Sequence, residues 1–406
     1  MSAADRLLAG REALGWRLGL DRMRRVCASL GDPQRSFSSV HVVGTNGKSS
    51  VTRLTAAILG QVGSKAGAYV SPHLDDWRER ILLGDSPIDE ASFERVLLRA
   101  EEAAQEADRS SGDDGPLTQF ELVTAAAFCA FEEGGVDIAV IEAGLGGRLD
   151  ATNVIPSRAT VLTSVGLDHT EWLGETLAEI ATEKLDVLRP GTTLVTGELP
   201  PDAERVAESV AVERGARRIR AEPWPWPGAA GFQQRNLGLA ASAASVVAPQ
   251  VDEDAVVRAR DASRLAGRFE VVPGDPDVVM DVAHNPDGAE ALAEAVGELA
   301  GGREVVCCLA LLSDKDAEGV VAGLSRACAR FICTQVPADA IEGSGRPMVG
   351  SHDPEELAAL CRARGCEAEV VSTPSEAWRR AMELARDEGG VALAAGSHYL
   401  LGCLYG

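Results

Sequence analysis

The segment from Gly44 to Ser50 combines glycines, a lysine and hydroxyl groups, which is the composition of a phosphate-binding loop. It lies between an apolar run and a run that favours a helix. Glycines let backbone N–H groups approach phosphate oxygens, and a helix start adds positive potential there. Lys48 supplies a point charge for the outer phosphates, and a hydroxyl at Ser49 or Ser50 is a ligand for Mg²⁺. The spacing differs from GxxxxGK[ST] because Val42 stands at the first glycine position.

Three other side chains could add metal or proton chemistry to this loop. Glu142 ends an apolar run and opens a glycine-rich segment, where a carboxylate facing the loop could hold Mg²⁺. His169 also follows an apolar run and has Asp168 and Glu171 nearby, which leaves a metal or proton-transfer role open. Lys184 lies in a helical pattern. Taken singly, Glu142 is more typical of an exposed or capping residue, His169 of a structural histidine and Lys184 of a solvated lysine. Only their combination favours a functional site.

The second half of the sequence offers a smaller polar group. Asp281 and His284 follow another apolar run, directly before a predicted helix start. Arg268 lies between a glycine and a phenylalanine, where an arginine from a cleft wall could reach nucleotide phosphates. Each signal is weak by itself.

The elements that must position these residues are strands alternating with helices. Apolar, β-branched runs predict strands at 39–43, 67–70, 136–141 and 159–165, and the run 51–59 predicts a helix. Such alternation is typical of a doubly wound, mostly parallel α/β sheet, in which ligands bind beyond the carboxyl ends of the strands. The polar clusters follow these strand ends.

A second strand–helix series without a phosphate loop begins near residue 270. Its predicted strands are 277–280, 303–312, 330–334 and 391–395. We therefore predict an ATP-binding domain over residues 1–270 and a smaller, Rossmann-like α/β domain over residues 271–406.

Composition and charge restrict the compartment and the partners. The formal net charge of −23 argues against a nucleic-acid surface, and no apolar run is long enough for a transmembrane helix. The first ten residues do not resemble a secretory signal, and the nine cysteines form no CxxC pair or zinc-type cluster. We expect a cytoplasmic protein without disulfides, without a membrane partner and without a nucleic-acid partner.

Together these segments resemble the folylpolyglutamate synthase/dihydrofolate synthase family, a branch of the Mur-type amide ligases. The resemblance runs from about Leu18 to Tyr399, with the landmarks in order. The landmarks are Leu18-Gly19-Leu20-Asp21-Arg22-Met23, Gly44-Thr45-Asn46-Gly47-Lys48, Ser71-Pro72-His73-Leu74, Thr118-Gln119-Phe120-Glu121, Glu142, Gly144 to Asn153, Asp168-His169-Thr170, Glu183-Lys184, Asn236, Gly267-Arg268-Phe269, Asp281 to Pro286 and Asp314-Lys315-Asp316.

The resemblance implies roles for residues across both predicted domains. ATP would be bound by Thr45, Asn46, Gly47 and Lys48, and from the junction and second domain by Asn236, Arg268 and Asp281. Ser49, Ser50 and His284 complete the set expected at the nucleotide. The pterin-side acceptor would contact Arg17, Leu18, Gly19, Leu20, Thr118, Gln119, Phe120, Glu121, Leu149, Asp150 and Ala151.

The same resemblance implies two Mg²⁺ ions and a modified lysine. Ser71 and Glu142 would hold one ion and His169 the second, with Lys184 carried as a carbamate beside it. Lys48, Lys184 and His169 would then be the catalytic residues. The implied reaction joins L-glutamate to dihydropteroate or tetrahydrofolate through an acyl phosphate made from ATP, in a monomeric enzyme.

Three departures from the family pattern leave the acceptor open. Ser49 stands where the family usually has glycine, Arg17 where an acid is common, and Leu185-Asp186 where Ala-Gly is usual. A related ligase acting on a non-folate carboxylate is therefore the main alternative. A nucleotide-binding regulator without catalysis is a further one, although it would be expected to lack Glu142, His169 or Lys184.

Overall fold

The chain forms two compact units, Met1–Ser263 and Arg264–Gly406. The computed structural model describes residues 3–15, 17–110, 115–341 and 349–405. The division falls before the predicted boundary at residue 270, because strand β9 (Arg268–Val272) pairs with β10 (Asp277–Asp281) of the second sheet. Arg268 therefore belongs to the second unit.

The first unit is built on an eight-stranded sheet in the order β4-β3-β2-β5-β1-β6-β7-β8. The strands from β2 to β8 in this order are parallel, and β3 and β4 form an antiparallel edge. Their bounds are β1 (Ser38–Val43), β2 (Ala66–Tyr69), β3 (Ile81–Leu83), β4 (Ser86–Pro87), β5 (Ile138–Glu142), β6 (Ala159–Leu162), β7 (Thr193–Thr196) and β8 (Arg217–Arg220). Strands β2, β5 and β6 are buried throughout, as expected for parallel strands covered on both faces.

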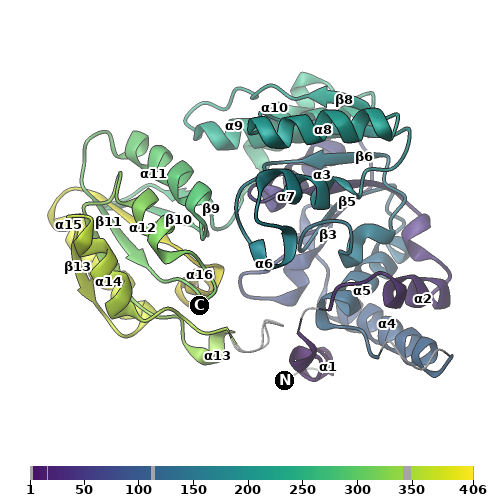
Figure 1. Cartoon of the computed structure of the whole chain (residues 1–406), viewed down its shortest axis with the longest axis horizontal. Helices are drawn as coiled ribbons and strands as arrows, with labels where there is room; N and C mark the ends of the chain where they lie inside the picture. The colour runs from purple at the N-terminus through teal and green to yellow at the C-terminus, as the bar shows by residue number, and fades with distance from the viewer. Residues whose placement is uncertain (1–2, 16, 111–114, 342–348, 406) are drawn as a thin grey trace. The chain divides into compact units, whose positions relative to one another are not determined.

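Helices lie on both faces of this sheet (Figure 1). The α-helices are α1 (Ala3–Ala9), α2 (Asp21–Ser29), α3 (Lys48–Gln61), α4 (Glu90–Ser110), α5 (Gln119–Glu133), α6 (Thr170–Leu173), α7 (Leu177–Leu185), α8 (Pro201–Glu213), α9 (Gly231–Val247) and α10 (Glu253–Ala262). Short 3₁₀ helices are η1 (Glu12–Leu14), η2 (Pro33–Arg35), η3 (Trp77–Arg80) and η4 (Ala151–Val154). Helices α3 and α9 pack together on one face, whereas α5, α7 and α8 contribute to the cores on the other face.

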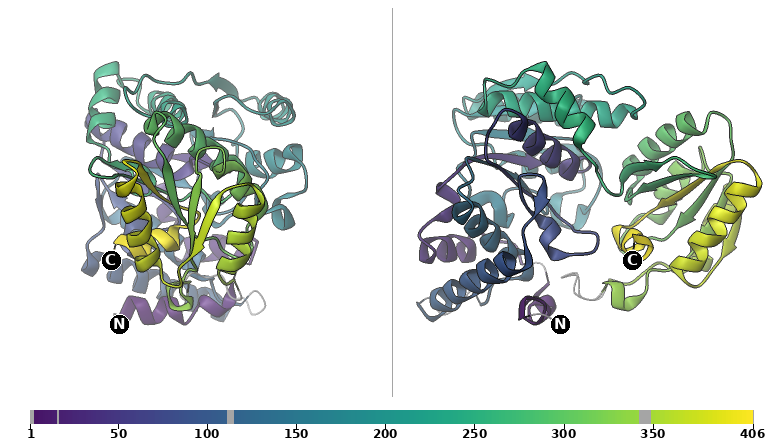
Figure 2. Two further views of the ribbon diagram at one scale, coloured as in Figure 1. Left: turned by 90° about the vertical axis from the view of Figure 1, so that its left-hand side faces the viewer. Right: turned by 180° about the vertical axis from the view of Figure 1, so that it is seen from behind.

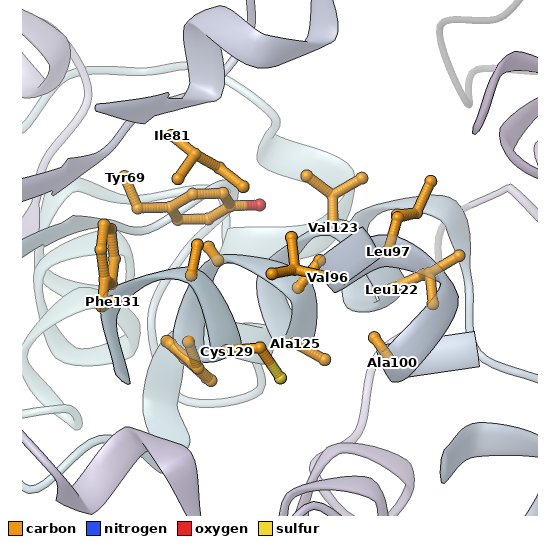
Figure 3. Close-up of a cluster of buried hydrophobic side chains, with 14 of the residues drawn as sticks. Tyr69, Ile81, Val96, Leu97, Ala100, Leu122, Val123, Ala125, Cys129 and Phe131 are labelled. Atoms are coloured by element: carbon orange, nitrogen blue, oxygen red, sulfur yellow. The ribbon is translucent and has the colours of Figure 1, made fainter. Parts of the chain in front are cut away.

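One core of the first unit lies between the sheet and the helices α4 and α5. Figure 3 shows Val96 and Leu97 of α4 beside Leu122 and Val123 of α5. These side chains are almost completely excluded from solvent, and Tyr69 of β2 closes the cluster on the sheet side. Burying each such aliphatic side chain contributes about 1.5–3 kcal/mol, so this layer holds α5 firmly against the sheet.

The second unit is a six-stranded sheet in the order β13-β12-β11-β14-β10-β9, parallel except for β9. Its other strands are β11 (Val305–Leu309), β12 (Arg330–Cys333), β13 (Glu367–Val370) and β14 (Val391–Ala395). Its helices are α11 (Pro286–Ala300), α12 (Ala317–Leu324), α13 (Ala338–Ile341), α14 (Pro354–Ala363), α15 (Pro374–Asp387) and α16 (His398–Tyr405). The left view of Figure 2 shows helices on either side of these strands. The predicted fold class, a doubly wound sheet followed by a smaller α/β unit, is confirmed.

The topology of the first sheet brings the predicted polar segments together. Strand β1 lies between β5 and β6, so the chain leaves β1 at the point where the strand order reverses. Parallel strands end at one edge, so the segment after Val43, the end of β5 at Glu142 and the segment after Leu162 meet there. Within the described residues, no helix combines the length and the apolar character that crossing a membrane requires.

Candidate active site

The phosphate loop connects β1 to α3 and requires glycine at two of its positions. Gly44 and Gly47 have φ values of 152° and 84°, in the region that side chains disfavour. A Cβ atom on Gly44 would stand 1.9 Å from Oγ1 of Thr163, and one on Gly47 would stand 2.7 Å from Oδ1 of Asn236. Thr163, which follows β6, and Asn236 on α9 therefore leave no room for a side chain at these two loop positions.

The residues that follow β6 hold the phosphate loop in place. The Thr45 hydroxyl donates to the carbonyl of Gly166 at 3.2 Å and accepts from its N–H at 3.0 Å. The backbone N–H of Asn46 donates to the Ser164 hydroxyl at 2.9 Å, and the Thr163 hydroxyl donates to the Asn46 carbonyl at 2.7 Å. Sequence reasoning missed this role of Thr163 and Ser164, although two hydroxyl residues after a neighbouring strand were the available signal.

Lys48 is the first residue of α3, and its ammonium group contacts the preceding loop. Its Nζ donates to the carbonyl oxygens of Gly44 and Thr45, each at 3.1 Å. The other two predicted residues of this helix turn, Ser49 and Ser50, are buried. Asn236 lies on α9 of the first unit, where its side chain is beside Gly47.

Glu142 is a buried carboxylate at the end of β5, with 1% of its surface exposed. Its Oε1 accepts a hydrogen bond of 3.0 Å from the Ser49 hydroxyl, and its Oε2 accepts one of 3.1 Å from the backbone N–H of Ser71. Carboxylate and hydroxyl oxygens are the hard donors that Mg²⁺ prefers. The donor set therefore fits a magnesium ion beside the phosphate loop, because Ser49 directly follows Lys48 in the chain.

Lys184 is buried in the last turn of α7, with 3% of its surface exposed. Its Nζ donates to the carbonyl oxygen of Gly44 at 3.0 Å. Burial and the neighbouring charge of Lys48 lower the pKa of Lys184 to about 7, against the opposing effect of Asp168 and two other acids. The interpretation of Lys184 as an ordinary solvated lysine is thus excluded, and its amine is poised to lose a proton near neutral pH.

His169 directly precedes α6 and has a left-handed backbone conformation, with a φ of 52°. Its side chain is 20% exposed, and its Nε2 lies 3.8 Å from a carboxylate oxygen of Asp168. An imidazole nitrogen is a less typical ligand for Mg²⁺ than an oxygen, but Asp168 adds a carboxylate at the same place. Among the described residues, no group of three or more histidine, cysteine, aspartate or glutamate side chains is arranged as a metal cluster.

Most of the residues expected to contact the acceptor are hydrogen-bonded to other parts of the protein or buried. Thr118 caps α5 and forms a reciprocal pair of hydrogen bonds with Glu121. The Glu121 carboxylate also accepts from Arg22 at 3.0 and 3.1 Å, and Arg22 donates to the Arg17 carbonyl at 2.7 Å. The structure therefore brings the segments of Arg17 and Glu121 together, with Arg22 as a link that sequence reasoning did not assign.

The other acceptor residues differ in exposure. Gln119 is buried and donates to the Leu8 carbonyl at 3.2 Å, whereas Phe120 is half-buried beside Tyr69. Arg17 and Leu18 are exposed, Gly19 is half-buried and Leu20 is buried.

The segment from Leu149 to Ala151 is anchored by its central carboxylate. Asp150 is buried and accepts from the backbone N–H groups of Leu145 at 2.8 Å and Thr152 at 2.9 Å. Burial raises the pKa of Asp150, and these hydrogen bonds oppose the rise. Leu149 is half-buried and Ala151 is buried, so the segment presents little exposed surface of its own.

In the second unit, Arg268 and Asp281 form a cross-strand pair at the edge of the sheet. The Asp281 carboxylate accepts from the N–H groups of Phe269 and Ala283, each at 2.7 Å. Burial raises the pKa of Asp281 to about 6, although the nearby Arg268 guanidinium lowers it. His284 lies three positions after Asp281, and its Nδ1 is 2.9 Å from the Val282 carbonyl oxygen.

Comparisons with known proteins support one family. The model described as "Mur ligase, glutamate ligase domain" matches residues 267–398. The dihydrofolate synthase/folylpolyglutamate synthase of Mycobacterium tuberculosis is 34% identical over 348 residues, covering 75% of this chain and 72% of the relative. A probable bifunctional folylpolyglutamate synthase/dihydropteroate synthase of Haloferax volcanii is 33% identical over 416 residues, covering 94% of this chain but 47% of the relative. The chain thus spans about half the length of that relative.

Two solved structures resemble the whole chain. Escherichia coli FolC in complex with DHPP and ADP has a TM-score of 0.88 at 29% identity, covering all of this chain and 97% of the other. A bifunctional folylpolyglutamate synthase/dihydrofolate synthase with Mn, AMPPNP and L-glutamate bound has a TM-score of 0.85 at 29% identity, with the same coverage. The chain belongs to the folylpolyglutamate synthase/dihydrofolate synthase family of ATP-dependent ligases.

Proposed function

We propose that this enzyme uses ATP to join L-glutamate, through an amide bond, to the carboxylate of dihydropteroate or of a tetrahydrofolate. The observation that carries the proposal is the convergence of Lys48 and Lys184 on the Gly44 carbonyl, close to the carboxylate of Glu142 that is bonded to Ser49. Cations and a metal-competent carboxylate at one phosphate loop match a reaction between two anions.

In the first step, the acceptor carboxylate attacks the γ-phosphate of ATP, forming an acyl phosphate and releasing ADP. Both reactants are anions, so the barrier depends on neutralising their charge. Lys48 and the backbone N–H groups at the start of α3 bind the outer phosphates. Thr45 and Asn46 are already fixed by hydrogen bonds to Ser164 and Gly166, so the loop binds phosphate without a large loss of conformational entropy.

Divalent metal supplies Lewis-acid polarisation of the phosphate oxygens when bound. We propose that Glu142, Ser71 and the Ser49 hydroxyl hold one Mg²⁺, and that His169 holds the second with Asp168 beside it. Ser49 replaces the usual glycine of the family and adds an oxygen donor rather than an obstruction, since its hydroxyl lies 3.0 Å from Glu142.

Lys184 is proposed to act as a carbamate. Carbamate formation joins the neutral amine of lysine to the carbon of CO₂ and releases one proton. The pKa of about 7 leaves a large part of the amine neutral at physiological pH, which an exposed lysine does not do. The product is an anionic oxygen ligand of the kind that Mg²⁺ prefers, close to Asp168 and the phosphate loop.

In the second step, the neutral amine of L-glutamate attacks the acyl carbon, phosphate leaves, and the nitrogen loses a proton to give the amide. Exclusion of water protects the acyl phosphate during this step. We propose that Arg268, Asp281 and His284 of the second unit contact the nucleotide, together with Asn236 of the first unit. The acceptor is proposed to lie along Arg17 to Leu20, Thr118 to Glu121 and Leu149 to Ala151.

We further propose that the enzyme acts as a monomer in the cytoplasm. Gel filtration coupled to light scattering tests the first part, because a mass near that of two chains would contradict it.

The deciding experiment measures phosphate release by the purified full chain with MgATP. Dihydropteroate and tetrahydrofolate are supplied separately, each with and without L-glutamate. We expect glutamate-dependent phosphate release with at least one acceptor, accompanied by a product heavier than the acceptor by one glutamyl residue. The same assay is run on Lys48→Ala, which removes the lysine charge at the phosphate loop. Lys65→Ala is its matched control because Lys65 is an exposed lysine. No glutamate-dependent turnover with either acceptor, together with turnover on a non-folate acid, would favour the alternative ligase.

A further inference from the structure

A separate pocket of about 750 Å³ lies in the first unit, at the beginning of β1 and β6. Arg35 ends η2 shortly before β1, and Arg158 directly precedes β6, and both line the pocket. The phosphate loop follows the opposite end of β1. The pocket is thus distinct from the ATP site and is large enough for a ligand of nucleotide size.

The pocket is strongly basic in a protein of net charge −23. Its described lining includes four arginines and a single acidic residue, Asp32. Arg24 and Arg35 have side chains 63% and 73% exposed, and their ion pairs with nearby aspartates are of the surface kind that contributes less than about 1 kcal/mol. Arg158 is also exposed. These guanidinium groups can reorient toward an anionic ligand at little cost.

One side of the pocket is preorganised. Arg189 donates to the carbonyl and the side-chain oxygen of Asn153 at 2.6 and 2.7 Å, and to the Ile155 carbonyl at 3.0 Å. These bonds fix a partly buried cation in the wall, so its position is set before a ligand arrives.

We propose that this pocket binds a small polyanion with several phosphate or carboxylate groups. Arg24, Arg35 and Arg158 bind its charged groups, beside the fixed guanidinium of Arg189. Arginine suits this task because its planar fork pairs with phosphate and carboxylate in two-point contacts.

Isothermal titration calorimetry of the full chain without Mg²⁺ tests the proposal, with tripolyphosphate, citrate and γ-linked triglutamate as separate probes. Tripolyphosphate carries phosphate groups, whereas citrate and triglutamate carry carboxylates. The three titrations therefore show which of the two groups the pocket binds. The double variant Arg35→Glu/Arg158→Glu should lose the site. Arg217→Glu/Arg220→Glu on β8 is its control, because both arginines are exposed, lie outside the pocket and give the same change in charge. Lys48→Ala separates binding at the phosphate loop from binding at the pocket.

The expected result is a binding step that survives Lys48→Ala and the β8 control but is lost in the pocket double variant. The proposal is overturned if no probe binds below about 1 mM, or if the pocket double variant binds as the wild type does. Loss of all binding in Lys48→Ala would also overturn it.

Discussion

The Nζ atom of Lys184 donates a 3.0 Å hydrogen bond to the carbonyl oxygen of Gly44, which begins the phosphate loop 140 positions earlier in the chain. Lys48 donates to the same carbonyl oxygen at 3.1 Å. Because a buried amine and a second cation share one acceptor, the protonated form of Lys184 is disfavoured and its pKa falls to about 7. Helix α7 is thereby linked electrostatically to the start of α3.

Replacing Lys184 with alanine should reduce ligation below detection, and added acetate should restore part of it by supplying a carboxylate in place of the carbamate. In the wild type, the neutral amine predominates as pH rises through about 7, so activation by bicarbonate should increase between about pH 6 and 8. Mass spectrometry under native conditions should detect the added carbamate. Turnover near that of the wild type by Lys184→Ala in bicarbonate-free buffer would show that the carbamate is unnecessary.

Lys48→Ala should lower kcat/KM for ATP by at least about 100-fold, because the charge on the outer phosphates is lost in a site of low dielectric. Circular dichroism should remain unchanged, because the ammonium donates to two carbonyl oxygens of the loop and Lys48 lies at the end of its helix. Lys65→Ala should behave as the wild type. A Lys48→Ala variant that keeps more than a tenth of wild-type turnover contradicts the assigned site.

Glu142→Gln should raise the Mg²⁺ concentration needed for half-maximal activity by about 10–100-fold, because an amide lacks the charge that a hard cation prefers. The size of the side chain is preserved, and its remaining oxygen can still accept from Ser49 or Ser71. A magnesium titration of the initial rate measures the effect. Glu208→Gln on α8, at an exposed glutamate, provides the control, and equal magnesium dependence in the two variants would rule out a metal role for Glu142.

Gly47→Ala should weaken nucleotide binding by about tenfold or more, because the new Cβ would crowd Asn236 at the phosphate loop. Gly63→Ala is a close control: its φ of 83° matches the 84° of Gly47, but nothing lies within 4 Å of the added Cβ. Both variants should lose about 1 kcal/mol of stability through the left-handed backbone. Equal nucleotide affinity in the two would show that Asn236 is not part of the site.

Glu121→Ala should reduce the free energy of unfolding by about 3–5 kcal/mol, because the buried Arg22 guanidinium loses its carboxylate and α5 loses its capping partner. Glu133→Ala, at a partly exposed glutamate paired with Arg95 and Arg99, should cost less than about 1 kcal/mol. Urea denaturation measures both values. Similar losses in the two variants would contradict the structural role assigned to Glu121.

The sequence by itself determined the fold class and the location of the phosphate loop. Local patterns sufficed because buried parallel strands are continuous apolar runs and because a glycine-rich turn with a lysine has few structural alternatives. The family followed from the order of the motifs, and the comparisons confirm it. The predicted boundary at residue 270 falls within β9, an edge strand whose antiparallel partner cannot be identified from its own residues, whereas the two compact units divide after Ser263.

Only the tertiary structure decided which individual side chains are buried, which are hydrogen-bonded to distant residues and which have shifted pKa values. In sequence, Lys184 follows Glu183 on a helix and looks like a solvated residue, yet it is buried against a loop from another part of the chain. The bonds between Glu142 and Ser49, and between Glu121 and Arg22, also join residues about a hundred positions apart. Burial and charge proximity depend on which distant segments meet, so pKa values and metal-competent groupings are set by packing and not by local sequence.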